Sequence, residues 1–190
     1  MNKKKIEKAI KMILEAVGED TKRDGLKGTP KRVAELYQEF FSGIKKDPKK
    51  ELKHYFFPNH DEMVIAKGIF FNSLCEHHLL PFFGKVHIVY IPDNNRITGF
   101  SRLARVIEVL SHRAQLQERL TSQVADVLME ALKPKGVLVI MEAEQLCLTL
   151  RGVKKLGAQT ITTASRGTLK DDKKKALALA LIKDKHLSSL

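Results

Sequence analysis

The sequence predicts an α+β protein in which a mainly antiparallel sheet carries two helices on one face and follows an N-terminal helical segment. Two observations predict this class. β-prone runs stand in pairs at both ends of residues 63–163, and two helical patterns fill the stretch between them. Because each pair of runs can close as a hairpin, the order ββααββ gives an antiparallel sheet with both helices on one face.

The N-terminal segment carries two helical patterns. Apolar residues recur at helical spacing over residues 6–17, so an amphipathic helix is expected to end near Gly18. Thr29 and Pro30 suit the N-cap and the first position of a second helix, which runs on to Gly43.

Five β-prone stretches supply the sheet. Residues 63–71 and 85–92 predict two strands that flank a short connection bearing Cys and His. Residues 137–142 and 146–150 predict two more, and a β-branched stretch follows at 160–163.

Helices are expected between the two strand pairs and in the tail. Ser101 suits the N-cap of a helix with apolar residues over 103–110, and a second helix is expected over 116–132. A short apolar helix flanked by lysines is expected over 176–182.

Length and composition suggest the domain organisation. The chain has 190 residues, 43% hydrophobic and 29% charged, which is the balance of an ordinary globular protein with one buried core. We expect a helical segment over 1–50, a core domain over 51–169 and a basic tail over 170–190.

The sequence offers no export or membrane pattern. The first helix mixes Lys and Glu into its apolar positions, and no run of about 18 apolar residues occurs. We therefore expect a cytoplasmic protein without a membrane partner. In that reducing compartment, two cysteines favour metal binding or free thiols over a disulfide.

The net charge of +12 comes from 34 Lys and Arg against 22 Asp and Glu. Much of it lies in lysine runs at 3–5, 45–50 and 170–175, which are typical of solvated faces. No aromatic residues are interleaved with these runs, so a stacking platform for single strands is not predicted. We expect no nucleic-acid partner.

Cys75 and His78 stand three residues apart, a spacing at which a thiolate and an imidazole can bind one metal from a turn. Cys147 is the other cysteine of the chain. Three such ligands leave a fourth tetrahedral position for water, as in a catalytic zinc site. Two alternatives stay open: His77 completes a closed structural site, or the spacing is fortuitous and the cysteines are small buried hydrophobes.

Longer motifs surround these residues. They are residues 73–84 with Cys-Glu-His-His and Pro-Phe-Phe-Gly, residues 99–105 (Gly-Phe-Ser-Arg-Leu-Ala-Arg), residues 115–121 (Gln-Leu-Gln-Glu-Arg-Leu-Thr) and residues 147–153 (Cys-Leu-Thr-Leu-Arg-Gly-Val). In type, order and spacing they resemble the motifs of the GTP cyclohydrolase I family. The resemblance extends over about residues 25–167.

This resemblance implies a fold, an activity and an assembly. The fold is the tunnelling fold, and the activity is zinc-dependent hydrolysis of the imidazole ring of GTP at C8, which releases formate and gives 7,8-dihydroneopterin triphosphate. The product would feed folate, another pterin or a deazaguanine. The resemblance also implies a homo-oligomeric ring, usually a decamer, with active sites at subunit interfaces.

By position, the resemblance makes Cys75, His78 and Cys147 the Zn²⁺ ligands. It makes His77 the acid/base residue beside the metal, the alternative being an imidazole that is only hydrogen-bonded in an interface. Glu76 is expected to orient the loop.

The resemblance also assigns the contacts to GTP. Gln117 and Glu118 match guanine-recognition positions, where a carboxylate accepts hydrogen bonds from base N–H groups; the alternative is a solvent-facing helical pair. The positions that match the triphosphate cradle are Ser101, Arg102, Arg105 and Arg151. Each of these arginines could instead make a surface ion pair.

One catalytic position departs from the family pattern. Two residues before Cys147 the family has a second catalytic histidine, and this sequence has Gln145. An amide can orient water or substrate but cannot shuttle a proton, and lost acid/base assistance costs about 10²–10⁴-fold on the step it serves. Glu144 is not expected to replace the histidine, because in an extended strand it points to the opposite face.

Three other functions compete with full turnover. With Gln145, ring opening can occur and later steps stall, which leaves a formamidopyrimidine nucleotide. A degenerate paralogue would bind zinc and nucleotide but only regulate, or co-assemble with, an active relative. The nitrile reductase of 7-deazaguanine metabolism shares the tunnelling fold, but it needs a lone nucleophilic cysteine, so the Cys-Glu-His-His cluster argues against it.

Overall fold

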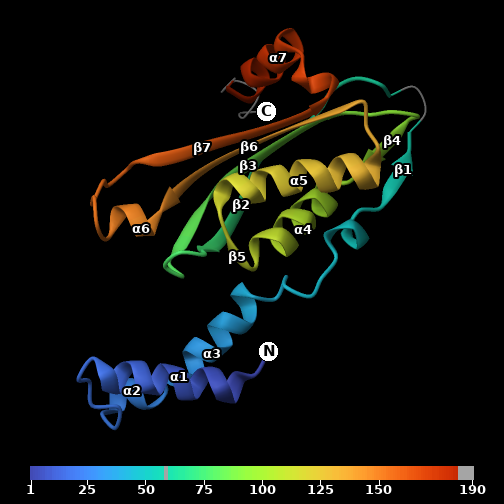
Figure 1. The fold of residues 1–190 in the computed structure, drawn as a ribbon. Helices are drawn as coiled ribbons and strands as arrows, with labels where there is room; N and C mark the ends of the chain where they lie inside the picture. The colour runs from blue at the N-terminus through green and yellow to red at the C-terminus, as the bar shows by residue number, and fades with distance from the viewer. Residues whose placement is uncertain (58–59, 184–190) are drawn as a thin grey trace. The chain divides into compact units, whose positions relative to one another are not determined.

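The computed structural model describes residues 1–57 and 60–183, and the chain divides into two compact units, Met1–Ser42 and Gly43–Leu190 (Figure 1). Each unit is described by itself. In the part of the chain that is described, no helix is both long enough and apolar enough to cross a membrane.

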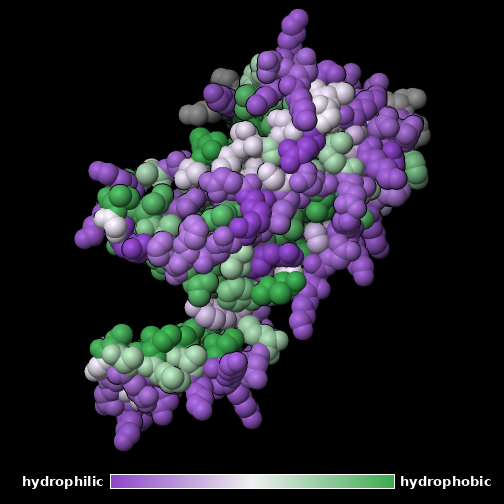
Figure 2. Space-filling view, in the orientation of Figure 1, coloured by the Kyte–Doolittle hydropathy of each residue, from purple (hydrophilic) through white to green (hydrophobic). Residues whose placement is uncertain are grey.

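The first unit consists of α1 (Lys3–Ala16), α2 (Asp24–Lys27) and α3 (Thr29–Phe40), with the Ala34 side chain fully buried. Both predicted helices are confirmed. The N-cap of α3 is Gly28 rather than the predicted Thr29, whose hydroxyl donates to Gly25 O instead. Figure 2 shows apolar surface gathered along one side of this unit.

The second unit is built on a five-stranded sheet. Its strands are β2 (Val64–Cys75), β3 (Pro81–Ile91), β5 (Ala114–Gln115), β6 (Gly136–Gln145) and β7 (Gln159–Gly167), in the spatial order β5-β2-β3-β6-β7. All neighbours are antiparallel except β5 and β2. A short helix, η1 (Pro48–Glu51), precedes a separate pair of strands, β1 (His54–Phe56) and β4 (Arg96–Thr98).

Two helices, α4 (Phe100–Ser111) and α5 (Gln117–Leu132), pack on one face of the sheet (Figure 1). On β3, Val86 and Ile88 point into this core, while the intervening His87 lies on the other face. The predicted α+β class is confirmed. Helix α4 begins one residue after Gly99, so Ser101 lies inside its first turn and is not the N-cap.

The other face of the sheet is partly covered by the C-terminal elements η2 (Thr168–Lys170) and α7 (Asp172–Lys183). Leu169 and Ala178 are fully buried there, in a cluster with Val89, Leu138 and Ile140. The tail therefore carries a longer helix than the expected 176–182, and helices lie on both faces. Residues 184–190 of the expected tail lie outside the described residues.

The prediction of a strand over 146–150 is wrong. Strand β6 ends at Gln145, and α6 (Leu146–Thr149) is a helical turn in which Leu150 N donates to Leu146 O at 2.9 Å. The Thr149 hydroxyl donates to Gln145 O at 3.2 Å and so helps to close the turn. Leucines alternate with Cys147 and Thr149 in this short stretch, which is the period-2 pattern of a strand, although the structure exposes Leu148 and Leu150 and buries the two residues between the leucines.

Candidate active site

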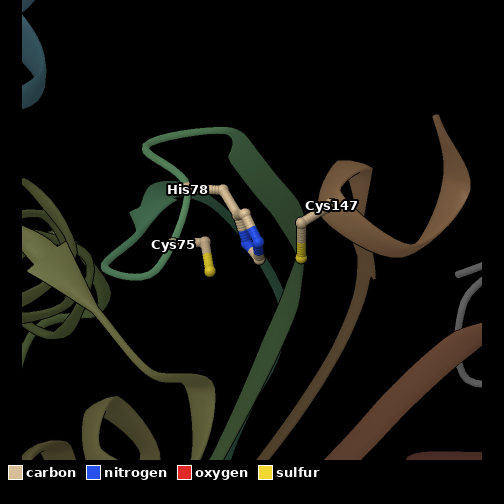
Figure 3. A group of neighbouring side chains, drawn as sticks. All are labelled: Cys75, His78 and Cys147. Carbon is tan, nitrogen blue, oxygen red and sulfur yellow. The ribbon is translucent and has the colours of Figure 1, made fainter. Parts of the chain in front are cut away.

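Three potential metal ligands converge from separate parts of the second unit. Cys75 is the last residue of β2, His78 lies in the turn between β2 and β3, and Cys147 lies in α6. Their ligand atoms all lie within 4.8 Å of one another. Figure 3 shows the three side chains pointing into one space, with the imidazole between the two sulfur atoms.

This donor set suits a zinc ion, because two thiolates and one imidazole are among the ligands that zinc prefers. Cys75 and Cys147 are buried free thiols, while His78 is exposed. Burial raises the pKa of the Cys147 thiol, and the neighbouring Cys75 raises it further. Metal binding requires the thiolate, so it must overcome this effect.

The turn that carries His78 is fixed at several points. Leu79 N donates to Cys75 O at 2.8 Å, and Leu79 has a left-handed backbone with φ of 52°. Glu76 N donates to Gln115 O at 3.0 Å, and the Glu76 carboxylate accepts two hydrogen bonds from Arg119, at 2.6 and 2.9 Å. The Arg119 guanidinium accordingly holds the pKa of Glu76 below its ordinary value. The metal-ligand turn is thereby tied to the start of α5.

The three potential metal ligands line a pocket of about 400 Å³. The predicted site residues that the structure brings to this pocket, besides the three metal ligands, are His77, Gln117, Glu118, Gln145 and Arg151. Glu118 and Arg151 are exposed, and Arg151 Nη1 lies 2.5 Å from His78 Nε2. The pocket therefore combines metal donors with a carboxylate and a guanidinium.

Three predicted residues lie elsewhere. Among the described residues, those that line the pocket do not include Ser101, Arg102 or Arg105. Arg105 lines a different depression, together with Lys46 and Glu51. Of the four residues predicted to bind the triphosphate, only Arg151 therefore lines the pocket within the described chain.

The strand alternation separates Gln145 from its neighbour. Gln145 faces the metal donors, whereas Glu144 lines a depression on the opposite face of the sheet with Phe70 and Lys85. Its carboxylate lies 3.2 Å from the Thr149 hydroxyl, whose single hydrogen it shares with Gln145 O. Glu144 is thus not placed to move protons in the pocket.

Sequence reasoning missed several residues that shape the site. Arg119 lies inside one of the quoted motifs, but its partner Glu76 is distant in sequence, so no local pattern pairs them. The pocket-lining residues that lie in the quoted motifs but received no role are Phe82, Gln115, Leu116, Leu148, Gly152 and Val153. Apolar lining residues have no spacing of their own that identifies them as such.

Fold and site together define an α+β protein with a pocket whose donors could bind a metal. A sequence model described as GTP cyclohydrolase I matches residues 6–183. A GTP cyclohydrolase 1 of Carboxydothermus hydrogenoformans is 59% identical over 88% of this chain and 87% of its own length. The chain belongs to the GTP cyclohydrolase I family.

Other relatives agree with this assignment. A GTP cyclohydrolase 1 of Streptococcus agalactiae is 58% identical over 90% of this chain and 92% of its own. One of Bacillus subtilis is 54% identical over 90% of each chain. A solved structure of an archaeosine synthase described as QueF-Like, in the apo form, gives a TM-score of 0.42 at 18% identity, over 55% of this chain and 93% of that one, which is too weak to add to the assignment.

Proposed function

We propose that this protein is a zinc-dependent GTP cyclohydrolase, which hydrolyses the imidazole ring of GTP at C8, releases formate and yields 7,8-dihydroneopterin triphosphate. One observation carries the proposal. Two thiols, an imidazole and the Glu118 carboxylate line a single pocket in a chain of the GTP cyclohydrolase I family.

Cys75, His78 and Cys147 would hold the metal ion, since they supply the donors that zinc prefers. When bound, zinc supplies Lewis acidity that lets water act as a nucleophile near neutral pH. His77 is exposed in the same pocket, and an imidazole can both donate and accept a proton, so we assign it the acid/base role.

Glu118 is the residue we propose for guanine recognition. Its carboxylate is exposed in the pocket and can accept hydrogen bonds from two adjacent N–H groups of the base. Arg151 supplies positive charge for the triphosphate from the same pocket.

Ser101, Arg102 and Arg105 complete the proposed triphosphate cradle from a second copy of the chain. Their absence from the lining of the described pocket supports a site shared between subunits. We propose a homo-oligomer, and a decamer by resemblance to the family.

The family resemblance also supports the remaining proposals. We propose that the core domain, 51–169, has the tunnelling fold, with a helical segment over 1–50 and a basic tail over 170–190. We further propose a cytoplasmic enzyme whose product feeds folate, another pterin or a deazaguanine, with neither a membrane nor a nucleic acid as partner.

Incubation of the zinc-loaded protein with GTP tests the main proposal. We expect formate and a pterin that becomes fluorescent after oxidation. Cys147→Ala serves as the matched control, because it removes one metal donor and should lose both bound zinc and product. If the zinc-loaded protein forms neither formate nor pterin, the proposal is wrong.

Gln145 favours a second candidate, in which ring opening occurs but rearrangement stalls at a formamidopyrimidine nucleotide. Mass spectrometry of the reaction separates the two, because the stalled nucleotide and the pterin differ in composition. A regulatory paralogue would form neither product until Gln145 is replaced by histidine.

A further inference from the structure

The side chain of Gln117 is buried, with 1% of the residue's surface exposed, although it lies in the first turn of α5 beside the pocket. Its Nε2 lies 3.1 Å from Met141 O on β6 and 2.9 Å from Thr160 O on β7. Carbonyl oxygens only accept hydrogen bonds, so the nitrogen end of the Gln117 amide must face these two strands.

Two threonines support the same orientation. Gln117 Nε2 lies 3.2 Å from Thr162 Oγ1, which in turn lies 2.6 Å from Thr121 Oγ1. The Thr121 hydroxyl donates to Gln117 O at 2.7 Å, so the hydroxyl of Thr162 must donate to that of Thr121, and its oxygen is left as a third acceptor for the two N–H groups of Gln117. The donors of Gln117 are therefore engaged within the chain.

The orientation of Gln145 follows from that of Gln117. With its nitrogen turned to the strands, Gln117 presents Oε1, and Gln145 Nε2 donates to it at 3.1 Å. If the Gln145 amide were rotated by half a turn, two carbonyl oxygens would face each other, which is unfavourable. Backbone carbonyls thus decide, through two linked amides, which end of Gln145 faces the pocket.

That end is the carbonyl oxygen. Gln145 Oε1 lies 3.9 Å from Cys147 Sγ, and both residues line the pocket. The pocket therefore meets a fixed, uncharged hydrogen-bond acceptor at this position.

We propose that Gln117 is a positioning residue that acts through Gln145, and that Gln145 Oε1 accepts a hydrogen bond from an O–H group in the pocket, from water or the ribose. This inference rests on the proposed function and deepens it. The amide of Gln117, which the family resemblance assigns to guanine, has its donors and its acceptor engaged within the chain. Of Gln117 and Glu118, only Glu118 therefore has a side chain available to recognise guanine.

A double-mutant cycle tests the coupling. Gln117→Met lowers kcat for GTP about tenfold in the native background, because Gln145 loses its anchor, and has no further effect in a Gln145→Leu background. In zinc-depleted protein, calorimetry should show the same Kd for GTP with and without Gln117→Met. A Gln117 that contacts guanine would instead weaken GTP about fivefold in both backgrounds, which would overturn the inference.

A second variant leaves Gln117 and its buried hydrogen bonds in place. Gln145→Glu keeps an oxygen toward the pocket but sets another oxygen against Gln117 Oε1, so we expect it to lose kcat as Gln145→Leu does. Gln159→Glu makes the same change on the exposed surface of β7, outside the pocket, and should leave kcat unchanged. A Gln145→Glu enzyme with native kcat would contradict the inference.

Two substrate analogues distinguish the sources of the O–H group. If the ribose supplies it, Gln145→Leu should no longer lower kcat for one of the two analogues, 2′-deoxy-GTP or 3′-deoxy-GTP. If water supplies it, Gln145→Leu should lower kcat for both analogues. A native protein that binds no GTP overturns the proposed function together with this inference. If the enzyme is active and the effects of Gln117→Met and Gln145→Leu on kcat are additive, this inference alone is overturned.

Discussion

Single side chains set the chemistry that the pocket can perform. Two thiols and an imidazole provide metal donors, and Glu118 provides an exposed carboxylate. Gln145 provides an amide where the family resemblance places a titratable imidazole, and Glu144 lies on the opposite face of the sheet. The described pocket therefore has His77 as its candidate proton carrier besides the potential metal ligand His78.

We expect Gln145→His to raise the rate of pterin formation about 10²-fold, because an imidazole can carry a proton that an amide cannot. One ring nitrogen can still donate to Gln117 Oε1, which leaves the other toward the pocket. Product fluorescence after oxidation measures the rate, and Gln159→His on exposed β7 is the control. An unchanged rate would show that the missing imidazole limits no step.

The buried Tyr90 should make the folded protein less stable at alkaline pH. Burial raises the pKa of its phenol, so the stability that this residue contributes is complete below about pH 10 and is lost as pH rises through the folded-state pKa. Tyr90→Phe should lower the free energy of unfolding by about 1 kcal/mol at neutral pH, because Thr98 N loses its acceptor. As pH rises above about 10, the variant should lose less stability than the native protein does, because it has no phenol to ionise. Urea unfolding at both pH values checks this, with exposed Tyr55→Phe as control.

At the scale of elements, the site depends on how the turn between β2 and β3 is held against α5. The two-pronged Glu76–Arg119 ion pair connects the turn to α5, and a backbone hydrogen bond from Glu76 N to Gln115 O connects it to β5, which directly precedes that helix. The same helix makes a second ion pair, Arg166–Asp126, with β7, which does not touch the metal-ligand turn. The two pairs offer a matched comparison.

Arg119→Gln should weaken zinc binding severalfold, because the turn that carries His78 loses an anchor. Arg166→Gln removes the ion pair between α5 and β7 and should leave zinc affinity unchanged. Competition with a chromophoric chelator measures both affinities. Equal zinc affinity in the two variants would show that the Glu76 pair does not position the ligands.

The docking of α7 depends on a small buried residue. Ala178→Asp should destabilise the second unit by several kcal/mol, because it places an unpaired carboxylate against Leu138 and Ile140. Ala180→Asp makes the same change at an exposed position of the same helix and should have little effect. Denaturant unfolding compares the two, and equal midpoints would place α7 away from the sheet in solution.

At the scale of the whole molecule, the proposed site is larger than one chain supplies. The described pocket holds the metal donors, Glu118 and Arg151, while Arg105 lies in a separate depression. A polyanionic triphosphate needs several fixed cations, so a second copy is the proposed source of the others.

Mixed oligomers test this arrangement. Cys147→Ala and Arg105→Ala should each be inactive, but refolding them together should restore part of the activity, because some interfaces then combine a native metal site with a native cradle. Assays of GTP turnover across mixing ratios measure the recovery. Recovery that never exceeds the sum of the separate variants would place the complete site in one chain.

The sequence alone determined the helices of the first unit, the α4 and α5 helices, the class of the fold and the residues that converge on the metal site. The helices and the class of the fold follow from local periodicity, and the resemblance of several motifs to one family grouped Cys147 with the distant Cys75 and His78. Only the tertiary structure decided that residues 146–149 form a helical turn, that α7 covers the second face of the sheet, and that Gln117 is buried with its amide engaged. The position of α7 and the burial of Gln117 depend on contacts between residues far apart in the chain, for which a local pattern carries no signal. The turn at 146–149 is closed by local hydrogen bonds, but its short alternating sequence is typical of a strand.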